Sequence, residues 1–344
     1  MDHSSRDGQS SKETADFKIN PTPLENKEFA LPLLDLIKIF FISIVLEVPK
    51  LLISLIQNLM KKPKSLKDKI CLVTGAGRGL GRELCIRLAN LKAVVVCVDI
   101  RKDINNETVK LIKDSGGKAY GYTCNVAKYE EVTKLAETVQ KEVGRVYMLV
   151  NNAGLIMTHH ACEWPTEEVI AMFNVNVISH FWTIQAFLPS MKEVNEGHIV
   201  SLLSSAAIIP TPSISVYSAT KAAAESLSNI CRLELNRNYE NKIVITDVYP
   251  SLIKTSQEMT AMFTTGMIKF LSVEKAAQLI IHGILYDKTF LVIPPSIYWF
   301  LILYRNLPDV IKIKLINASV INLNVPSKEF KETIPFNDIK KKCL

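Results

Sequence analysis

Residues Thr74–Gly81 read TGAGRGLG, and this short stretch decides the fold. The apolar run Ile70–Thr74 precedes it, and Leu80–Leu91, a segment with the period of a helix, follows it. Glycine lets a backbone come close to a pyrophosphate, and the first N–H groups of the following helix are free to bind one. A glycine-rich turn alone is weak evidence, but a strand before it and a helix after it predict a dinucleotide-binding turn.

Strand and helix patterns continue to alternate from Lys69 onward, and this alternation predicts a mostly parallel sheet with helices on both faces. We therefore expect an α/β fold, a Rossmann-type doubly wound parallel sheet of about seven strands. The predicted strands are Ile70–Thr74, Ala93–Asp99, Ala119–Cys124, Val146–Val150, His198–Leu203, Ile243–Tyr249 and Phe290–Ile293. The predicted helices are Leu80–Leu91, Ile104–Asp114, Tyr129–Glu142, Glu167–Met191, Tyr217–Tyr239 and Val273–Tyr286.

Composition excludes several classes of protein. Of the 344 residues, 48% are hydrophobic and 22% charged, which excludes a disordered chain. The net charge of +7 is mild and no basic block alternates with aromatic residues, so no nucleic-acid partner is predicted. The seven cysteines form no C-x-x-C pair and predict buried thiols in a reducing compartment. The adjacent His159 and His160 lack a third ligand at suitable spacing, so we predict loop packing there and no metal site.

Composition also divides the chain into four parts. Residues 1–28 are polar and predict a disordered tail. Residues 29–62 predict a membrane-associated helix, and residues 66–295 carry the alternating pattern of the Rossmann domain. Residues 296–344 hold an apolar appendage, including Ile297–Leu307, and a basic C-terminal tail.

The predicted membrane-associated helix is strongly amphipathic. Twenty of the thirty residues from Leu31 to Met60 are apolar. In a helix, the polar residues after residue 42 fall within an arc of roughly 100°, which is typical of a helix lying in a membrane interface. The alternatives are a helix packed on the domain's own core and a tilted span with snorkelling charges. The polar residues are Ser43, Glu47, Lys50, Ser54, Gln57 and Asn58, and the lysines that follow are Lys61, Lys62, Lys64, Lys67 and Lys69.

The second predicted strand ends at Asp99, eighteen residues after Gly81. A carboxylate there accepts hydrogen bonds from the ribose hydroxyls of NAD and repels the additional phosphate of NADP. Arg78 lies inside the glycine-rich turn and favours that phosphate. We expect Asp99 to lie closer to the phosphate position, so NAD is the predicted cofactor and NADP the alternative.

Two further motifs occur in order after the glycine-rich turn: NNAG at Asn151–Gly154 and YSATK at Tyr217–Lys221. Together with TGxxxGxG they resemble the short-chain dehydrogenase/reductase superfamily over about residues 66–295. More narrowly, HHACEWPTEE, HFWTIQAFLP and the apolar N-terminal segment are similar to its membrane-bound branch. That branch contains retinol dehydrogenases and 17-beta-hydroxysteroid dehydrogenases of lipid droplets.

The resemblance implies four catalytic residues: Ser204, thirteen residues before Tyr217, then Tyr217, Lys221 and Asn176 of FNVN. Tyr217 and Lys221 are four apart and share a helix face. Because the pKa of a free tyrosine is about 10, a nearby lysine cation and the nicotinamide charge are expected to favour the phenolate. The resemblance then implies that Tyr217 takes the alcohol proton, Ser204 binds the substrate oxygen, Lys221 holds the ribose and Asn176 holds a water in a proton relay.

The resemblance also implies a cofactor site, with two departures from the family pattern. Asn125 stands where the family usually has Asp, and Ser251 where many members have Gly; neither removes the site. The predicted cofactor-binding residues are Thr74, Gly75, Gly77, Arg78, Gly79, Leu80, Gly81, Asp99, Asn125, Val126, Asn152, Ala153, Gly154, Tyr217, Lys221, Pro250 and Thr255.

The predicted function is NAD-dependent oxidation of a lipophilic, retinol-like alcohol to its carbonyl on a membrane surface. The alternatives are a steroid or long-chain fatty alcohol as substrate, and a lipid-surface protein with a vestigial active site. The four catalytic residues argue against the last, because binding alone does not require them together. The expected partners are the lipophilic substrate, the membrane surface and, from the resemblance, further copies of the chain in a homo-oligomer.

Two further predictions concern the C-terminal residues and the segment Ser251–Leu271. Residues Lys341-Lys342-Cys343-Leu344 look like a dilysine retrieval signal, which predicts the cytosolic face of the endoplasmic reticulum; the alternative is a solvated lysine-rich tail. An interfacial helix also permits transfer to lipid droplets. Residues Ser251–Leu271, rich in Met and Phe, predict a mobile lid over an apolar substrate, with a core helix as the alternative.

Overall fold

The computed structural model describes Lys38 and residues 62–160, 163–255, 263–265, 270–319 and 321–323. The chain divides into two compact units, Met1–Lys61 and Lys62–Leu344. The predicted disordered tail and nearly all of the predicted membrane-associated helix therefore lie outside the described residues. In the ranges that are described, no helix has both the length and the apolar character needed to cross a bilayer.

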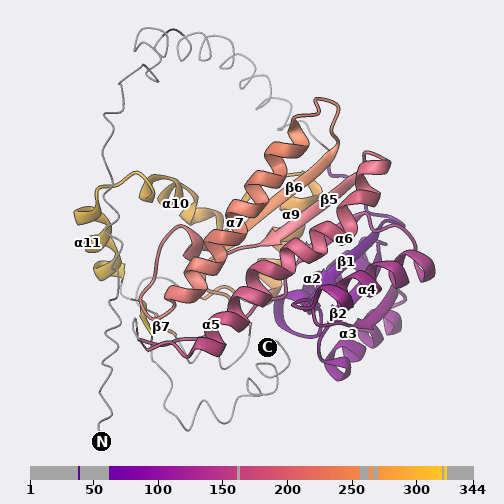
Figure 1. Ribbon diagram of the computed structural model, residues 1–344, viewed down its shortest axis with the longest axis horizontal. Coiled ribbons are helices and arrows are strands. Elements are labelled where there is room, and N and C mark those ends of the chain that lie inside the picture. Colours follow the sequence, from indigo (N-terminus) through magenta and orange to yellow (C-terminus); the bar gives the residue numbers. More distant parts are fainter. Residues whose placement is uncertain are drawn as a thin grey trace, which may run out of the picture. The chain divides into compact units, whose positions relative to one another are not determined.

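Seven strands of the second unit form one sheet, in the order β3-β2-β1-β4-β5-β6-β8, and every neighbouring pair is parallel (Figure 1). The predicted doubly wound sheet is confirmed, and each predicted strand agrees with an observed strand to within two residues. The order reverses between β1 and β4, and in such sheets the crevice at this reversal is where ligands bind. The strands are β1 Ile70–Thr74, β2 Val94–Asp99, β3 Lys118–Thr123, β4 Met148–Asn151, β5 Gly197–Leu202, β6 Ile243–Pro250 and β8 Phe290–Ile293.

Helices cover both faces of this sheet, which is why its central strands are continuous apolar runs. Every residue of β4 and β5 is buried. On one face pack α2 (Gly79–Asn90), α3 (Lys102–Asp114) and α9 (Val273–Leu285). On the other pack α4 (Tyr129–Glu142), α6 (Ser179–Glu193) and α7 (Ser215–Asn236).

The predicted helix Glu167–Met191 consists of three pieces. α5 (Thr166–Phe173) and α6 are joined by η1, a turn of π-helix at Asn174–Ile178. A hydrophobic period of 3.6 residues does not reveal such a turn, because both flanking segments keep the helical pattern. π-turns inside helices are frequent at functional sites, and this one contains Asn176.

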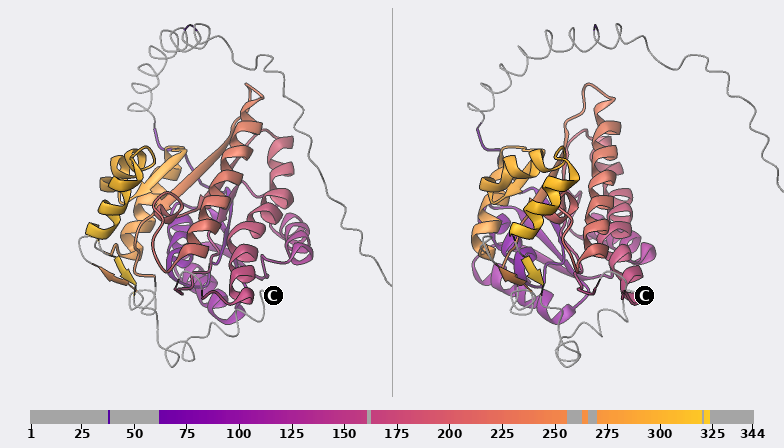
Figure 2. Two further views of the ribbon diagram at one scale, coloured as in Figure 1. Left: turned by 60° about the vertical axis from the view of Figure 1, so that its left-hand side comes forward. Right: turned by 90° about the vertical axis from the view of Figure 1, so that its left-hand side faces the viewer.

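The apolar appendage packs on the sheet. After a short turn of 3-10 helix, η3 (Pro295–Ile297), the chain forms α10 (Tyr298–Tyr304) and α11 (Asp309–Ser319). Figure 2 shows these two helices in gold at the margin of the domain on the side of β8, the edge strand. Leu301 and Tyr304 are buried in one cluster with Leu203 and Ile208, which flank the loop after β5.

The predicted lid is only partly described. Ile253 forms an isolated parallel bridge with Leu271, so the two ends of the segment lie side by side. Between them, β7 (Phe263–Thr265) pairs antiparallel with β9 (Ile321–Leu323), which follows α11. Met259, Met262 and Met267 lie outside the described residues, and the lid stays a prediction.

Candidate active site

A cavity of about 320 Å³ opens at the carboxyl ends of the strands, at the reversal between β1 and β4. Nearly all of the predicted site residues line it. Thr74, Gly77 and Asn176 are the exceptions, and each of them lies behind the wall and holds a lining segment in place. The predicted residues in the lining are Gly75, Arg78, Gly79, Leu80, Gly81, Asp99, Asn125, Val126, Asn152, Ala153, Gly154, Ser204, Tyr217, Lys221, Pro250 and Thr255.

The backbone of the glycine-rich turn lies directly at the cavity, and at two of its positions only glycine fits, because a side chain would collide with neighbouring backbone atoms. A Cβ on Gly81 would lie 2.1 Å from the carbonyl oxygen of Gly75. Gly75 itself has a φ of +66°, and a Cβ there would lie 3.0 Å from the Cα of Ala153. α2 begins at Gly79, so its first N–H groups belong to the cavity wall, where an anion is favoured.

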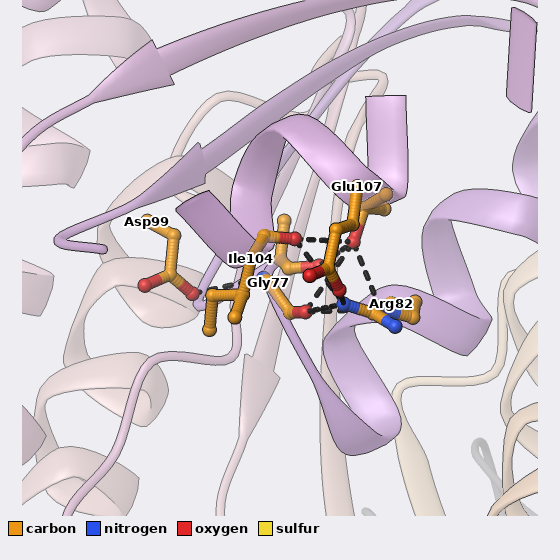
Figure 3. A network of polar contacts seen from close by, with 7 residues as sticks. Gly77, Arg82, Asp99, Ile104 and Glu107 are labelled. Atoms are coloured by element: carbon orange, nitrogen blue, oxygen red, sulfur yellow. Dashed lines mark hydrogen bonds and ion pairs between the residues drawn. The ribbon is translucent and has the colours of Figure 1, made fainter. Parts of the chain in front are cut away.

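A polar network behind the turn fixes its shape (Figure 3). The guanidinium of Arg82 donates from Nε to the carbonyl oxygen of Gly77 at 2.9 Å and forms an ion pair with Glu107 at 2.9 Å. Thr108 donates its hydroxyl to the carbonyl of Ala76 at 3.0 Å. Sequence reasoning missed Arg82 and Thr108. Neither lines the cavity, and the bonds of Arg82 to Glu107 and of Thr108 to Ala76 each span more than twenty residues of the chain.

Asp99 ends β2 at the cavity and also supports the turn. Its Oδ2 accepts a hydrogen bond from the Gly77 N–H at 2.8 Å, and its Oδ1 accepts one from the Arg101 N–H at 2.9 Å. Each carboxylate oxygen has a second lone pair, so Asp99 retains capacity to accept ribose hydroxyls. Arg78 is exposed in the same cavity wall, as the competing prediction requires.

The ends of β1 and β4 are joined through Thr74 and Asn152. The hydroxyl of Thr74 accepts hydrogen bonds from the N–H groups of Asn152 and Ala153, both at 3.0 Å. In return, the Asn152 amide donates to the Thr74 carbonyl at 2.9 Å. This exchange explains why a Thr before the glycine turn and an Asn in the NNAG motif occur together.

Ser204, Tyr217 and Lys221 meet on the opposite side of the cavity. Ser204 follows β5, and Tyr217 and Lys221 lie in the first two turns of α7. The Lys221 ammonium donates to the carbonyl of Leu202 at 2.7 Å and lies 5.7 Å from the centre of the Tyr217 ring. Burial lowers the pKa of Lys221 to about 8, so this lysine changes charge near neutral pH.

Two opposing effects act on the pKa of Tyr217. Burial raises the pKa to about 12, while a hydrogen bond with Ser204 lowers it. In the protein without cofactor, the loss of water around the phenol therefore has a larger effect on the pKa of Tyr217 than the neighbouring side chains have. An additional positive charge at the cavity is needed to bring the pKa of Tyr217 towards neutral pH.

Asn176 is fully buried in the π-turn η1 and binds the loop that carries Gly154. Its Oδ1 accepts from the Leu155 N–H at 2.7 Å, and its Nδ2 donates to the Leu155 carbonyl at 2.8 Å and to the Thr220 hydroxyl at 3.0 Å. Asn176 thus joins the loop after β4 to α7. The structure brings it into the cluster as a positioning side chain behind the cavity wall.

His180 is a buried residue beside Lys221 to which we assigned no role from the sequence. Burial and the charge of Lys221 lower the pKa of His180 to about 3, so the ring is neutral. Its Nε2 makes no hydrogen bond to any of the residues that the structure describes. His180 lies within HFWTIQAFLP, on the buried side of α6.

Two side-chain contacts hold the loop with His159 in place. His159 bonds to Glu168 through Nε2 at 2.6 Å, and its ring stacks edge-on against Trp164 at 4.8 Å. Among the described residues, no group of three His, Cys, Asp or Glu side chains is placed to hold a metal ion.

Comparison with known proteins gives the family. A family model for short chain dehydrogenases matches residues 69–264, more than half of the chain. Short-chain dehydrogenase/reductase family 16C member 6 of Bos taurus is 39% identical over 236 residues, covering 68% of this chain and 75% of the relative. Epidermal retinol dehydrogenase 2 of Mus musculus is 36% identical over 258 residues, covering 74% and 84%. A solved short-chain dehydrogenase/reductase from Burkholderia phymatum, in complex with NAD, has a TM-score of 0.64 at 22% identity and covers 76% of this chain and 99% of its own.

This chain belongs to the short-chain dehydrogenase family, and it is an NAD(P)-dependent oxidoreductase that acts on alcohols. Within the family it is similar to the retinol dehydrogenase branch. The family and the fold predicted from TGxxxGxG, NNAG and YSATK are therefore confirmed.

Proposed function

We propose that this chain oxidises a lipophilic, retinol-like alcohol to its carbonyl with NAD as hydride acceptor, at a membrane surface. The observation that carries the proposal is that one cavity holds Ser204, Tyr217 and Lys221 on one side and the glycine-rich turn with Asp99 on the other. The three side chains on one side can transfer a proton, and the turn and the carboxylate on the other side can bind a dinucleotide.

The cofactor side fits NAD in shape and charge. Gly75 and Gly81 leave the backbone bare where a pyrophosphate needs close approach, and α2 begins there with free N–H groups. Asp99 presents its carboxylate at the end of β2, which favours ribose hydroxyls over a phosphate. When bound, NAD supplies an acceptor for the hydride and a positive charge on its nicotinamide ring.

The protein's own residues handle the proton. Ser204 holds the substrate oxygen beside Tyr217, with which it already shares a hydrogen bond. The Tyr217 phenolate accepts the hydroxyl proton as the carbonyl forms. Lys221 stabilises that phenolate through its charge, since its ammonium lies 5.7 Å from the ring centre. Asn176 fixes the position of Lys221 relative to the NNAG loop, because its side chain hydrogen-bonds both to Thr220, next to Lys221, and to Leu155.

A lipophilic substrate is supported by the apolar part of the cavity wall and by the names of the relatives. Leu155, Ile156, Val175, Leu203 and Ile253 line the cavity beside the catalytic residues. A relative named epidermal retinol dehydrogenase 2 covers three quarters of this chain. These observations favour a retinol-like alcohol as the first substrate class to test.

Attachment to a membrane, on the cytosolic face of the endoplasmic reticulum, is part of the proposal. It rests on the amphipathic composition of residues 29–62 and on cysteines that suit a reducing compartment. A homo-oligomer is supported by exposed apolar side chains on α6 and α7, namely Phe181, Ile230 and Leu233. Protease protection of microsomes tests the topology, because a cytosolic domain is digested without detergent.

The deciding experiment is turnover by the purified full chain. All-trans-retinol, estradiol and a long-chain fatty alcohol are each supplied with NAD or NADP, and NADH or NADPH formation is followed. We expect the highest kcat/KM with retinol and NAD. Binding of NADH without turnover of any alcohol would mean a vestigial site, and a preference for NADP would mean that Arg78 outweighs Asp99.

A further inference from the structure

A group of exposed apolar side chains lies on α10 and α11. Within fifteen residues, Trp299 is 70% exposed, Leu303 60%, Val310 66% and Ile313 59%. Phe300 and Ile311 are exposed beside them. These six residues are named here the α10–α11 surface. Large apolar side chains left exposed in this number within one short segment indicate an interaction site on a folded domain.

The opposite side of the same two helices is firmly packed, so the exposed side is a fixed feature of the fold. Leu301 and Tyr304 of α10 are buried, and Ile316 of α11 packs in the same cluster. Trp299 and Leu303 are four residues apart and share one helix face, as do Val310 and Ile313, three apart. α10 therefore buries one apolar side and presents another to solvent, while α11 is anchored more lightly, through the partly buried Ile316.

Three of the four charged residues around this surface are positive, but Arg305 is paired with Glu225 of α7 at 2.6 Å. From residue 296 to residue 319 the charged residues are Arg305, Asp309, Lys312 and Lys314. Lys312 pairs with Asp309 and lies 6.0 Å from the centre of the Tyr304 ring, while Lys314 is exposed. Aromatic and aliphatic side chains bordered by lysines are the composition that binds the interface of an anionic bilayer.

We propose that the α10–α11 surface docks the folded domain onto an anionic lipid bilayer. A second copy of the chain is the less favoured occupant, because residues 296–319 carry a net positive charge, which would meet a like charge across a two-fold interface. The proposal goes beyond attachment through residues 29–62, since it gives the catalytic domain a lipid contact of its own.

This docking surface is structurally connected to the substrate side of the cavity. α10 and α11 share a packed cluster with Leu203 and Ile208, the residues on either side of the loop that begins at Ser204. β9 follows α11 and pairs with β7, which lies inside the candidate lid. A bilayer that contacts the α10–α11 surface is therefore next to the segments through which a lipophilic alcohol would enter.

Tryptophan quenching tests the contact directly in the full chain. The protein is mixed with vesicles of brominated phosphatidylcholine, with and without phosphatidylserine. Because Trp299 is one of three tryptophans and the most exposed of those described, we expect quenching of about one third of the emission with phosphatidylserine. The quenching should fall at high salt and should be lost in Trp299→Phe. Equal quenching of wild type and Trp299→Phe would overturn the proposal.

Charge substitutions give an independent test. Vesicle affinity is measured for the pair Leu303→Glu with Ile313→Glu and for a matched control, Leu111→Glu with Val194→Glu, at exposed apolar positions on α3 and at the end of α6. We expect about a tenfold loss of affinity for the first pair and little change for the control. Both pairs should turn over a detergent-solubilised alcohol at the wild-type rate, which separates this proposal from the enzymatic one. A change of oligomeric state in the first pair, without loss of vesicle affinity, would assign the surface to a second copy.

Discussion

The two sides of the cavity are built in opposite ways. The cofactor side, at the ends of β1 and β2 and the start of α2, presents backbone N–H groups and the single carboxylate of Asp99. The catalytic side, at the end of β5 and the start of α7, presents the side chains of Ser204, Tyr217 and Lys221. Backbone N–H groups bind any ligand whose acceptor atoms match their spacing. Titratable side chains such as Tyr217 and Lys221 act through their protonation state.

This difference also shows in how each side is held. The glycine-rich turn is fixed by hydrogen bonds from residues that do not touch the cavity, such as Arg82 and Thr108. The catalytic residues are held by their own burial, which shifts the pKa of Tyr217 to about 12 and that of Lys221 to about 8. We therefore expect substitutions on the cofactor side to change cofactor affinity by graded amounts. Substitutions of the catalytic side chains should abolish turnover.

The largest expected effect comes from Tyr217→Phe. Removing one oxygen takes away the proton acceptor but leaves the glycine-rich turn and Asp99 intact. We expect kcat to fall by about 10²–10⁴-fold, the usual contribution of a positioned acid or base. The Kd for NADH, measured by fluorescence titration, should stay within about twofold of the wild-type value. A variant that keeps more than about a tenth of wild-type kcat would show that Tyr217 is not the proton acceptor.

The pH dependence is the next largest effect. Burial raises the pKa of Tyr217, so at neutral pH the phenol is protonated and only its deprotonated form accepts a proton. The kcat/KM for alcohol oxidation at saturating NAD should therefore rise with pH from 6, by up to about tenfold per unit. The rise should weaken above about 8, where Lys221 loses its charge. Carbonyl reduction needs the phenol and should be nearly flat from pH 6 to 8; a rate of oxidation that falls over this range contradicts the assignment.

Asp99→Asn should have a smaller effect, on cofactor choice. The substitution keeps an oxygen that can accept the Gly77 N–H, yet it removes the negative charge that repels a 2′-phosphate. We expect the ratio of kcat/KM for NAD to that for NADP to fall by about tenfold, equivalent to about 1.4 kcal/mol. Thermal unfolding of the variant checks that the turn is intact. An unchanged ratio would assign cofactor choice to another residue, Arg78 being the first to test.

The sequence predicts the parts of this structure that depend on local pattern. The strands were readable because both faces of the sheet are covered, which makes the central strands largely apolar, with few polar residues such as His198 and Asp247. The glycine-rich turn was readable because Gly75 and Gly81 have no room for a side chain. The glycine-rich turn and Asp99 followed from these features, and the resemblance implied the rest of the cavity lining, which parallel strands bring to one edge of the sheet.

The parts that depend on distant contacts were not readable. Asn176 was placed in the site by resemblance, but its bonds to Leu155 span 21 residues and the π-turn around it leaves no periodic signal. The pKa of Tyr217 in the protein without cofactor depends on burial, a property of the whole fold that the sequence does not give, whereas Lys221 four residues later is visible in the sequence. The sequence does not show which side of α10 and α11 is exposed, because this depends on how their other side packs against the rest of the fold.

The smallest expected effect, and the sharpest test of the difference between the two sides, is Arg82→Lys. Lysine keeps the positive charge beside Glu107 but cannot donate from two nitrogens to the carbonyl of Gly77, as the guanidinium does. We expect KM for NAD to rise by about three- to tenfold with kcat nearly unchanged, because the turn loses rigidity while the catalytic residues are untouched.

The matched control for that test is Arg87→Lys on the same helix. Arg87 forms an ion pair with Glu83 along α2 and does not contact the glycine-rich turn, so its substitution should leave both constants unchanged. Because Arg82 does not line the cavity, a rise in KM confined to Arg82→Lys means that the cofactor side depends on the shape of its backbone. A fall in kcat with unchanged KM would instead mean that the two sides of the cavity are coupled, and the division drawn between them would not hold.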